Sequence, residues 1–480
     1  MKLYNTPERE VVEFKPMDTR EVKVYTCGPT VYDYQHIGNY TAYVYWDVLV
    51  RVLRLNGWKV KRVLNITDVG HLVSDEDEGE DKMEKGARRT GKTVWEVAEY
   101  YTEDFLRNFK KLGLLEPNVI SKATDYIAED LELIRTLKRK GFTYEIDDGI
   151  YFDTAKFPRY AEFARIDVEA LKAGARVEFN EMKRNVTDFA LWKFVRAGEK
   201  HDMQWETPVD LFDGDEEVMG YPGWHIECSA IIKATLGETI DIHTGGIDHI
   251  PVHHTNEVAQ SEAAHDVKLA NYWLHNNHIT IDGQKVSKSL GNTYTLDQLE
   301  ERGFSAADFK LWVMQGHYQT GRNFSFENLE AAKNRLKAWR SVAVLRHQLH
   351  DTIVRDGDKN TNLLKMPEMI TGALNDNLNT PMALAMIDEV FARLGNSNLE
   401  NVSKKSLVGF LEFLDEALGI DLIKATPDIS EELKRKILAR ERARAERDFA
   451  GADEIREEIE AEGIILRDTM NRTLWEYGEK

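Results

Sequence analysis

The chain has 480 residues, of which 42% are hydrophobic and 30% charged, a balance that suits a water-soluble globular protein of about three domains. No stretch of about 20 apolar residues would span a membrane, and the N-terminus lacks the apolar core of a signal peptide, so we expect a cytoplasmic protein without membrane contact. The net charge of −20 argues against a general nucleic-acid-binding protein, but it does not exclude a local basic face. Cys27 and Cys228 are far apart in the sequence, and in the cytoplasm we expect no structural disulfide between them.

A strand, a helix and a second strand are predicted near the N-terminus. Residues 22–26 are β-branched and alternate in polarity, and they run into a Cys-Gly-Pro-Thr turn at 27–30. Residues 40–55 have the apolar spacing of a helix, and residues 59–66 have the pattern of another strand. This order predicts the beginning of a parallel α/β sheet.

The α/β pattern is interrupted by a long segment. Residues 93–206 are predicted to be helical with one small β element at 149–153, and we interpret them as an insertion in a catalytic domain of residues 1–300. The α/β pattern resumes over residues 224–292. The acidic residues 74–81 are predicted to form a solvated loop without a chemical role.

The rest of the chain is predicted to be mainly helical. Residues 301–425 form a polar helical region, and a Thr-Pro-Asp boundary separates it from a small C-terminal domain at 426–480. That last domain is charged and helical until residue 462 and is then predicted to form a strand at 463–466.

Residues 27–39 are a candidate phosphate-binding segment. They lie where a strand gives way to a helix, and helix N-termini attract phosphate through free N–H groups and the helix dipole. Gly38 would let a nucleotide approach the backbone, and His36 has a side chain that can donate a hydrogen bond to a phosphate oxygen. A tight turn capped by a histidine is the alternative.

Residues 285–292 are a second candidate. Lys285 and Lys288, with neighbouring serines and a glycine, would form a flexible cationic loop that can close over a polyphosphate. An ordinary solvated loop would have the same composition.

Cys27, Cys228, His253 and Glu257 are candidate metal ligands. His253 and Glu257 are four residues apart and would share one face of a helix, and thiolate with imidazole favours zinc over hard cations. Because these ligands come from three distant segments, their spacing leaves open a structural histidine and a surface glutamate.

A basic helix face is predicted within residues 434–447. Arg440, Arg444 and Arg447 would lie on the same side. Glutamates are interspersed, so the pattern fits either a nucleic-acid-binding face or an exposed helix with salt bridges.

Together the two phosphate-binding candidates resemble the signatures of class I aminoacyl-tRNA synthetases. Residues 36–39 (His-Ile-Gly-Asn) resemble the HIGH signature, and residues 285–289 (Lys-Val-Ser-Lys-Ser) resemble KMSKS. The second histidine of HIGH is Asn39 here, whose amide still donates a hydrogen bond, and Val286 replaces the methionine of KMSKS.

The chain is similar to cysteinyl-tRNA synthetases over nearly its whole length. The similarity is carried by residues 27–32, 223–229 and 253–257, by residues 377–383 in the helical region, and by residues 448–456 near the C-terminus. The Asp-Thr-Met-Asn-Arg-Thr-Leu-Trp stretch ending at Trp475 departs from the family's usual Pro-Gln-Gly.

The resemblance implies a fold, an activity and a cofactor. The fold would be α/β, with a Rossmann-like parallel-sheet catalytic domain and its insertion, a stem-contact region and helical bundle, and a small anticodon-recognition domain. The activity would be that of a cysteine–tRNA ligase, with L-cysteine, ATP and cysteine tRNA as substrates and Mg²⁺ accompanying ATP. One Zn²⁺ ion per chain would hold the substrate thiolate, and serine would be rejected without an editing site because its hydroxyl is a poorer zinc ligand. We expect a monomer.

The resemblance also implies site residues. The zinc ligands would be Cys27, Cys228, His253 and Glu257; the residues around the ATP phosphates would be His36, Asn39, Lys285 and Lys288; those around the amino acid and adenosine would be Thr30, Thr67, Trp224, His243 and Asp248. The tRNA-binding residues would be Arg444, Asp453, Arg456, Asp468 and Trp475, although Trp475 fits a packed C-terminal residue equally well.

Two other functions share these motifs. A ligase that activates cysteine and transfers it to a small amine would have the same catalytic motifs but would need no anticodon domain. A zinc-stapled tRNA-binding protein without catalysis would not need His36, Lys285 and Lys288.

Overall fold

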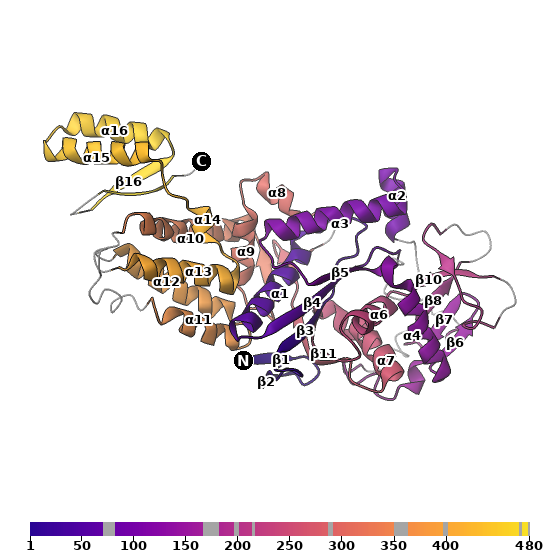
Figure 1. Ribbon diagram of the computed structural model, residues 1–480. Coiled ribbons are helices and arrows are strands. Elements are labelled where there is room, and N and C mark those ends of the chain that lie inside the picture. Colours follow the sequence, from indigo (N-terminus) through magenta and orange to yellow (C-terminus); the bar gives the residue numbers. More distant parts are fainter. Residues whose placement is uncertain are drawn as a thin grey trace. The chain divides into compact units, whose positions relative to one another are not determined.

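The computed structural model describes the chain in two compact units (Figure 1). One unit comprises residues 1–306 with 318–324, and the other comprises 307–317 with 325–480. In the described part of the chain, no helix is long and apolar enough to cross a membrane. The described residues are 1–70, 82–166, 182–195, 201–213, 217–286, 291–349, 363–396, 402–469 and 473–478.

A five-stranded parallel sheet is the centre of the first unit. Its strand order is β12-β11-β3-β4-β5, and every neighbouring pair is parallel. The strand predictions at 22–26 and 59–66 are confirmed, as is the α/β fold class. The strands are β3 (Glu21–Thr26), β4 (Lys59–Ile66), β5 (Val119–Lys122), β11 (Ile240–Gly246) and β12 (Ala270–Asn276).

Helices cover both faces of this sheet. Val63 packs with Cys228 and Ile231 of α6 (Ile226–Thr235), whereas its neighbour Arg62 lies beneath the ring of Phe109 in α3 (Val94–Lys111). Because successive strand residues point to opposite faces, α6 and α3 lie on opposite sides of the sheet.

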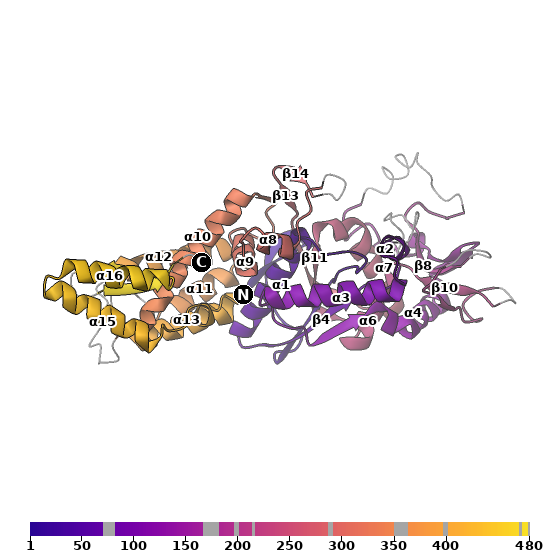
Figure 2. The ribbon, with the colours of Figure 1, turned by 90° about the horizontal axis from the view of Figure 1, so that it is seen from above.

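Helix α1 (Ile37–Leu55) connects β3 with β4 and lies beside α3 (Figures 1 and 2). It is buried along most of its length, which is why its sequence is apolar almost all round. Its two buried charged residues form an ion pair, with Arg51 Nε 2.7 Å from Asp47 Oδ2. Asp47 also accepts the backbone N–H of Leu115 at 2.7 Å, so the pair ties α1 to the segment after α3.

The segment predicted as an insertion, residues 93–206, is richer in strands than its sequence indicated. Its first strand, β5, belongs to the parallel sheet. Its other four described strands and β10, which follows residue 206, form a five-stranded antiparallel sheet of order β6-β7-β8-β10-β9, whereas only the element at 149–153 was expected and is found as β7. Helix α4 (Ile127–Arg139) packs against it around the buried Trp192. The strands are β6 (Thr143–Ile146), β7 (Gly149–Phe152), β8 (Phe189–Phe194), β9 (Trp205–Glu206) and β10 (Met219–Pro222).

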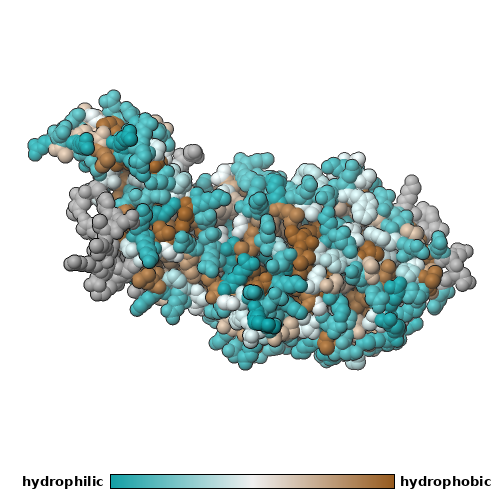
Figure 3. Space-filling model, in the orientation of Figure 1, coloured by the Kyte–Doolittle hydropathy of each residue, from teal (hydrophilic) through white to brown (hydrophobic). Residues whose placement is uncertain are grey.

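An apolar groove lies on the α3 side of the parallel sheet. It has a volume of about 390 Å³ and is lined by Leu64, Phe109, Leu114 and Ile120, among others. In Figure 3 a brown area in the middle of the molecule lies over β4, β5 and α3.

Shorter elements complete the first unit. They are β1 (Lys2–Asn5), β2 (Glu10–Glu13), α2 (Lys82–Thr90), η1 (Ala123–Tyr126), η2 (Thr154–Lys156), η3 (Ile247–His249), η4 (Ile250–His254), α7 (Thr255–His265), β13 (Ile279–Ile281), β14 (Gln284–Lys285), β15 (Arg322–Phe324) and α8 (Leu296–Glu300).

The second unit is helical until its last residues, as the sequence indicates. Asp388 joins two of its helices, because it accepts hydrogen bonds from Arg335 Nε at 3.0 Å and Trp339 Nε1 at 2.7 Å. The elements are α9 (Ala306–Met314), α10 (Phe326–Ala343), η6 (Val344–His347), α11 (Met366–Asn375), α12 (Thr380–Asn396), α13 (Lys404–Leu418), α14 (Leu422–Ala425), α15 (Glu431–Ala445), α16 (Phe449–Ala461), β16 (Ile464–Asp468) and β17 (Thr473–Tyr477).

Candidate active site and metal centre

A cleft of about 780 Å³ lies at the carboxyl ends of the parallel strands. Its wall includes Cys27 after β3, Gly246 at the end of β11 and Asn276 at the end of β12. Open α/β sheets bind ligands at this edge, because the loops that follow neighbouring strands converge there. Six of the residues singled out from the sequence line the cleft: Cys27, Thr30, His36, Asn39, Asp248 and Lys285.

The start of α1 faces the cleft. His36 is its N-cap residue, and Asn39 Oδ1 accepts the backbone N–H of His36 at 3.1 Å. A Cβ atom on residue 38 would lie 2.9 Å from the imidazole of His36, so glycine is needed here for the ring to fold over the helix end. The first turn contains no acidic residue, which leaves the positive end of the helix dipole available to an anion.

The second cationic segment is only partly described. Lys285, at the end of β14, lines the cleft, and its carbonyl oxygen accepts a hydrogen bond from Asn292 Nδ2 at 3.0 Å. Lys288 lies outside the described residues.

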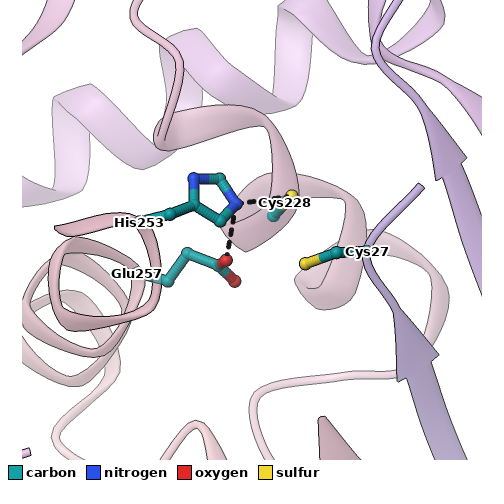
Figure 4. A group of neighbouring side chains, drawn as sticks. All are labelled: Cys27, Cys228, His253 and Glu257. Atoms are coloured by element: carbon teal, nitrogen blue, oxygen red, sulfur yellow. Dashed lines mark hydrogen bonds and ion pairs between the residues drawn. The ribbon is translucent and has the colours of Figure 1, made fainter. Parts of the chain in front are cut away.

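Four potential metal ligands meet beside the cleft (Figure 4). The donor atoms of Cys27, Cys228, His253 and Glu257 all lie within 4.8 Å of one another. His253 Nε2 is 3.5 Å from Cys228 Sγ and 2.9 Å from Glu257 Oε1. They come from four places in the fold, since Cys27 follows β3, Cys228 is in α6, His253 is in η4 and Glu257 is in the first turn of α7.

The electrostatics of this cluster favour a bound cation. Burial raises the pKa of the Cys27 thiol, and the hydrogen bond to Cys27, followed by burial, raises the pKa of the Cys228 thiol. Burial would also raise the pKa of Glu257, but His243 and His253 hold it below its ordinary value. Burial would lower the pKa of His253, but Glu257 and Cys228 raise it to about 10. The cluster therefore stabilises a positive charge between its thiols and carboxylate.

The donor set fits a zinc-like metal ion. Zinc–ligand distances of about 2.0–2.3 Å place tetrahedral ligands roughly 3.3–3.8 Å apart; the distance of 3.5 Å between His253 Nε2 and Cys228 Sγ lies in this range, and the 2.9 Å between His253 Nε2 and Glu257 Oε1 is shorter. Two thiolates and an imidazole favour such an ion, and a carboxylate is also a common zinc ligand. Binding would displace the protons that burial keeps on the thiols.

A second group of donors overlaps the first. It consists of Cys27, His243, His254 and Glu257. His254 Nδ1 is 2.7 Å from His275 Nε2, and the other ring nitrogen of His275 is 2.7 Å from Thr6 Oγ1. We favour the first group because it contains both thiols.

His243 lies behind the metal cluster and does not line the cleft. It is fully buried, its Nε2 is 2.8 Å from Glu257 Oε2, and its ring stacks on Trp273 with centroids 4.3 Å apart. Through this contact it orients the carboxylate of Glu257, as outer residues of metal sites commonly do.

The remaining predicted substrate residues surround the same region. Trp224 stacks on His253 with centroids 4.8 Å apart. Thr67 is buried, forms an isolated bridge with Thr30 and donates a hydrogen bond to Glu227 Oε2 at 3.2 Å. Asp248 is exposed at the wall of the cleft.

Several histidines of the site were not identified from the sequence. His249 and His275 lie near the candidate metal ligands and belong to none of the motifs, and His254 was included only as a member of the motif at 253–257. A signal was present, because eight of the 14 histidines of the chain lie between residues 225 and 278. Such a density of imidazoles is typical of metal-binding segments.

The C-terminal residues form a separate candidate site. Asp468 accepts two hydrogen bonds from Arg440, at 2.7 and 2.8 Å, and a further one from Arg444. Arg440 is only 1% exposed, so one member of the predicted basic face belongs to the interior. Asp453 is exposed on α16, and Arg456 Nη2 donates to the carbonyl oxygen of Leu466 at 2.6 Å.

Trp475 is packed, which is the alternative that its sequence context left open. It is 6% exposed and stacks on His347 with centroids 6.0 Å apart, so its ring faces are covered. The exposed aromatic residue of this domain is Phe449 at the start of α16, which is 62% exposed. The sequence had placed Phe449 only within a family motif.

Comparisons with known proteins agree with this arrangement. The family model described as the tRNA synthetases class I (C) catalytic domain matches residues 13–334, and that of the cysteinyl-tRNA ligase anticodon binding domain matches residues 426–475. A cysteine–tRNA ligase of Treponema denticola is 40% identical, with 99% of both chains covered, and cysteine–tRNA ligase 1 of Burkholderia lata is 44% identical over 98% of this chain and 95% of its own. A solved methionyl-tRNA synthetase of Mycobacterium tuberculosis in complex with methionyl-adenylate shares the fold, with a TM-score of 0.60 at 14% identity over 85% of this chain and 93% of its own. The chain thus belongs to the cysteinyl-tRNA ligase family.

Proposed function

We propose that the protein activates L-cysteine with ATP and transfers it to the 3′ end of cysteine tRNA. The observation that carries this proposal is the position of Cys27. It lines the cleft at the carboxyl edge of the sheet, and it belongs to the cluster of four potential metal ligands. A cysteine bound in the cleft would therefore have its thiol beside a metal site, where sulfur can be distinguished from the oxygen of serine.

The metal ion would be Zn²⁺, one per chain, held by Cys27, Cys228, His253 and Glu257. When bound, it would supply a soft Lewis acid that prefers a thiolate to a hydroxyl group. The chain itself fixes the geometry of this site. His243 contacts Glu257, Trp224 covers one face of His253, and the cluster is buried with Cys27 at the wall of the cleft.

The first chemical step would be attack of the cysteine carboxylate on the α-phosphate of ATP. The carboxylate is ionised near pH 7, so no general base is needed and catalysis consists of positioning and charge stabilisation. His36, Asn39 and the N-terminus of α1 would bind the phosphates from one side of the cleft, and Lys285 and Lys288 from another. Mg²⁺ would accompany ATP. Thr30, Thr67 and Asp248 would contact the amino acid and the adenosine.

The tRNA would be recognised by the second unit. Arg444, Asp453, Arg456 and Asp468 would form the anticodon site, with the exposed ring of Phe449 as a stacking surface. We further propose that residues 1–300, with the insertion 93–206, carry activation, that 301–425 contact the tRNA stem, and that 426–480 read the anticodon. The protein would act as a monomer in the cytoplasm.

The match of residues 426–475 to an anticodon-binding domain favours tRNA over a small amine as the acceptor. The His36 and Lys285 side chains at the cleft favour an enzyme over a tRNA-binding protein without catalysis.

The first test is aminoacylation of purified tRNA with cysteine, comparing the zinc-loaded protein with Cys228→Ser. We expect the native protein to charge only cysteine tRNA and the variant to lose bound zinc and charging together. Formation of cysteinyl-adenylate without charging of any tRNA would mean that the acceptor is a different molecule. Activation of serine at a rate comparable with cysteine would refute the role proposed for the metal.

A further inference from the structure

Two exposed tyrosines lie at the mouth of the cleft. Tyr34 and Tyr100 are each 42% exposed, their hydroxyl groups are 2.7 Å apart, and their rings meet edge to face with centroids 6.1 Å apart. We call this pair the tyrosine platform. Tyr34 also lines the cleft, so the platform is continuous with the proposed active site. The proposed activation of cysteine does not require these two rings.

The platform is held in place from below. The ring of Tyr101, which is only 4% exposed, packs 5.0 Å from that of Tyr34. Arg89 of α2 donates hydrogen bonds to Asp33 Oδ2 at 2.9 Å and to the hydroxyl of Tyr101 at 3.2 Å. Helix α2 also lies against the same loop, because a Cβ on Gly86 would be 2.9 Å from the carbonyl oxygen of Tyr32. Ordered rings cost little entropy when they bind a flat ligand.

One cation lies directly at the platform. Lys92 Nζ is 4.2 Å from the ring centroid of Tyr100. Arg89 of the neighbouring helix α2 is paired with Asp33, and the α3 carboxylate of Glu99 is 2.6 Å from Lys122. The platform therefore offers aromatic faces beside a cation, the combination that binds single-stranded nucleic acid.

We propose that the tyrosine platform binds the single-stranded 3′ end of the tRNA, with a base stacked on Tyr34 or Tyr100 and a backbone phosphate near Lys92. This proposal rests on the proposed function, because that function requires a tRNA 3′ end to enter the cleft. Stacking on an aromatic ring needs no particular base, which suits an RNA end that has to be guided into the site.

The test is a binding cycle with two RNA probes at one fixed salt concentration. One is a transcript of cysteine tRNA, and the other is the same transcript without its single-stranded 3′ nucleotides. We expect Tyr100→Ala to weaken binding of the complete transcript roughly tenfold, the loss of one base–aromatic stack, and to leave binding of the truncated transcript unchanged within twofold. Tyr100→Phe keeps the ring faces and should bind both transcripts like the native protein.

Lys92→Ala provides a second, electrostatic measurement. It should weaken binding of the complete transcript and reduce the salt dependence of that binding by about one phosphate contact. Lys110→Ala is the matched control, because Lys110 is an α3 lysine that lines the apolar groove and not the platform. Equal weakening of both transcripts by Tyr100→Ala, or no weakening of either, would overturn the proposal.

Assays of the native protein distinguish a failure of this proposal from a failure of the proposed function. If it exchanges pyrophosphate into ATP with cysteine and charges cysteine tRNA while Tyr100→Ala leaves the binding cycle unchanged, only the platform is refuted. If it shows neither exchange nor charging, the proposed function itself is wrong.

Discussion

Replacement of His243 by phenylalanine tests whether the four candidate metal ligands depend on a histidine that contacts Glu257 from outside the set. His243 Nε2 is 2.8 Å from Glu257 Oε2, and both side chains are fully buried. Phenylalanine keeps a ring of similar size against Trp273, which His243 stacks on at a centroid distance of 4.3 Å, but it removes the nitrogen that holds the carboxylate. The substitution therefore isolates the polar contact from the packing.

The magnitude follows from the role of this contact. Loss of a partner that orients a metal ligand typically reduces metal affinity 10–100-fold, or about 1.4–2.7 kcal/mol. The buried carboxylate also loses a hydrogen-bond partner, which costs about 1–3 kcal/mol in the metal-free protein. We expect His243→Phe to bind zinc about 10–100-fold more weakly and to unfold at a lower temperature than the native protein when both are metal-free.

Zinc affinity is measured by competition with a chromogenic chelator, and stability by thermal unfolding with and without metal. His265→Phe is the matched control, since it removes an imidazole from the end of the same helix α7, two turns beyond Glu257. A folded His243→Phe protein whose zinc affinity stays within twofold of the native value would refute the orienting role.

Three further predictions concern other parts of the chain. Gly38→Ala places a Cβ 2.9 Å from the imidazole of His36, so the ring should be displaced and ATP–pyrophosphate exchange should fall about tenfold or more, while zinc content stays unchanged. Lys288→Ala should slow adenylate formation roughly 10²–10³-fold in a single-turnover assay, by analogy with the loss of one charge-stabilising donor, and an effect on tRNA affinity alone would contradict this. Asp468→Asn should destabilise the C-terminal domain by about 2 kcal/mol at pH 7, because it leaves Arg440 buried without a charged partner, and hydrogen exchange of residues 426–469 would detect this. The hydrogen bond from Arg440 lowers the pKa of Asp468 in the folded state. The stabilisation by Asp468 is therefore complete above the unfolded pKa of about 4 and is lost as the pH falls further. A difference in stability between the native and variant proteins that grows below pH 4 would contradict this pH dependence.

Local patterns predicted the parallel sheet well. The strands at 22–26 and 59–66 and the helix between them were recognised because the apolar residues of each segment follow a clear strand or helix period. The α1 helix is also apolar enough to be recognised without knowing what it packs against. The sheet of the insertion was largely missed because its strands have only two to six residues and pair across long gaps in the sequence. No short window contains the information that β8 lies beside β10.

The candidate site, like the fold, was predicted from the sequence only in part. Cys27, Cys228, His253 and Glu257 were named as candidate metal ligands from their residue types, but nothing in their spacing brings three distant segments to one point, so only the family resemblance favoured a ligand set over a structural histidine and a surface glutamate. His243 had been expected beside the substrate, and its position behind Glu257 depends on where β11 lies relative to α7, which is a property of the folded sheet. For Trp475 the sequence left packing and stacking open, and the contact with His347 decides for packing.

The topology of the sheet explains why the metal cluster and the phosphate-binding segment are neighbours. Cys27 is the first residue after β3, and His36 is the N-cap of the helix that follows, so both belong to one loop at the carboxyl edge. Cys228 reaches the same point because α6 packs on the face of the sheet to which Tyr25 and Val63 contribute. A substrate held by its sulfur near Cys27 would therefore have its carboxylate within reach of a nucleotide at the start of α1. Selection of the thiol and activation of the carboxylate would then be linked by the length of one amino acid. We therefore expect homocysteine, a longer thiol, to support slower ATP–pyrophosphate exchange than cysteine does.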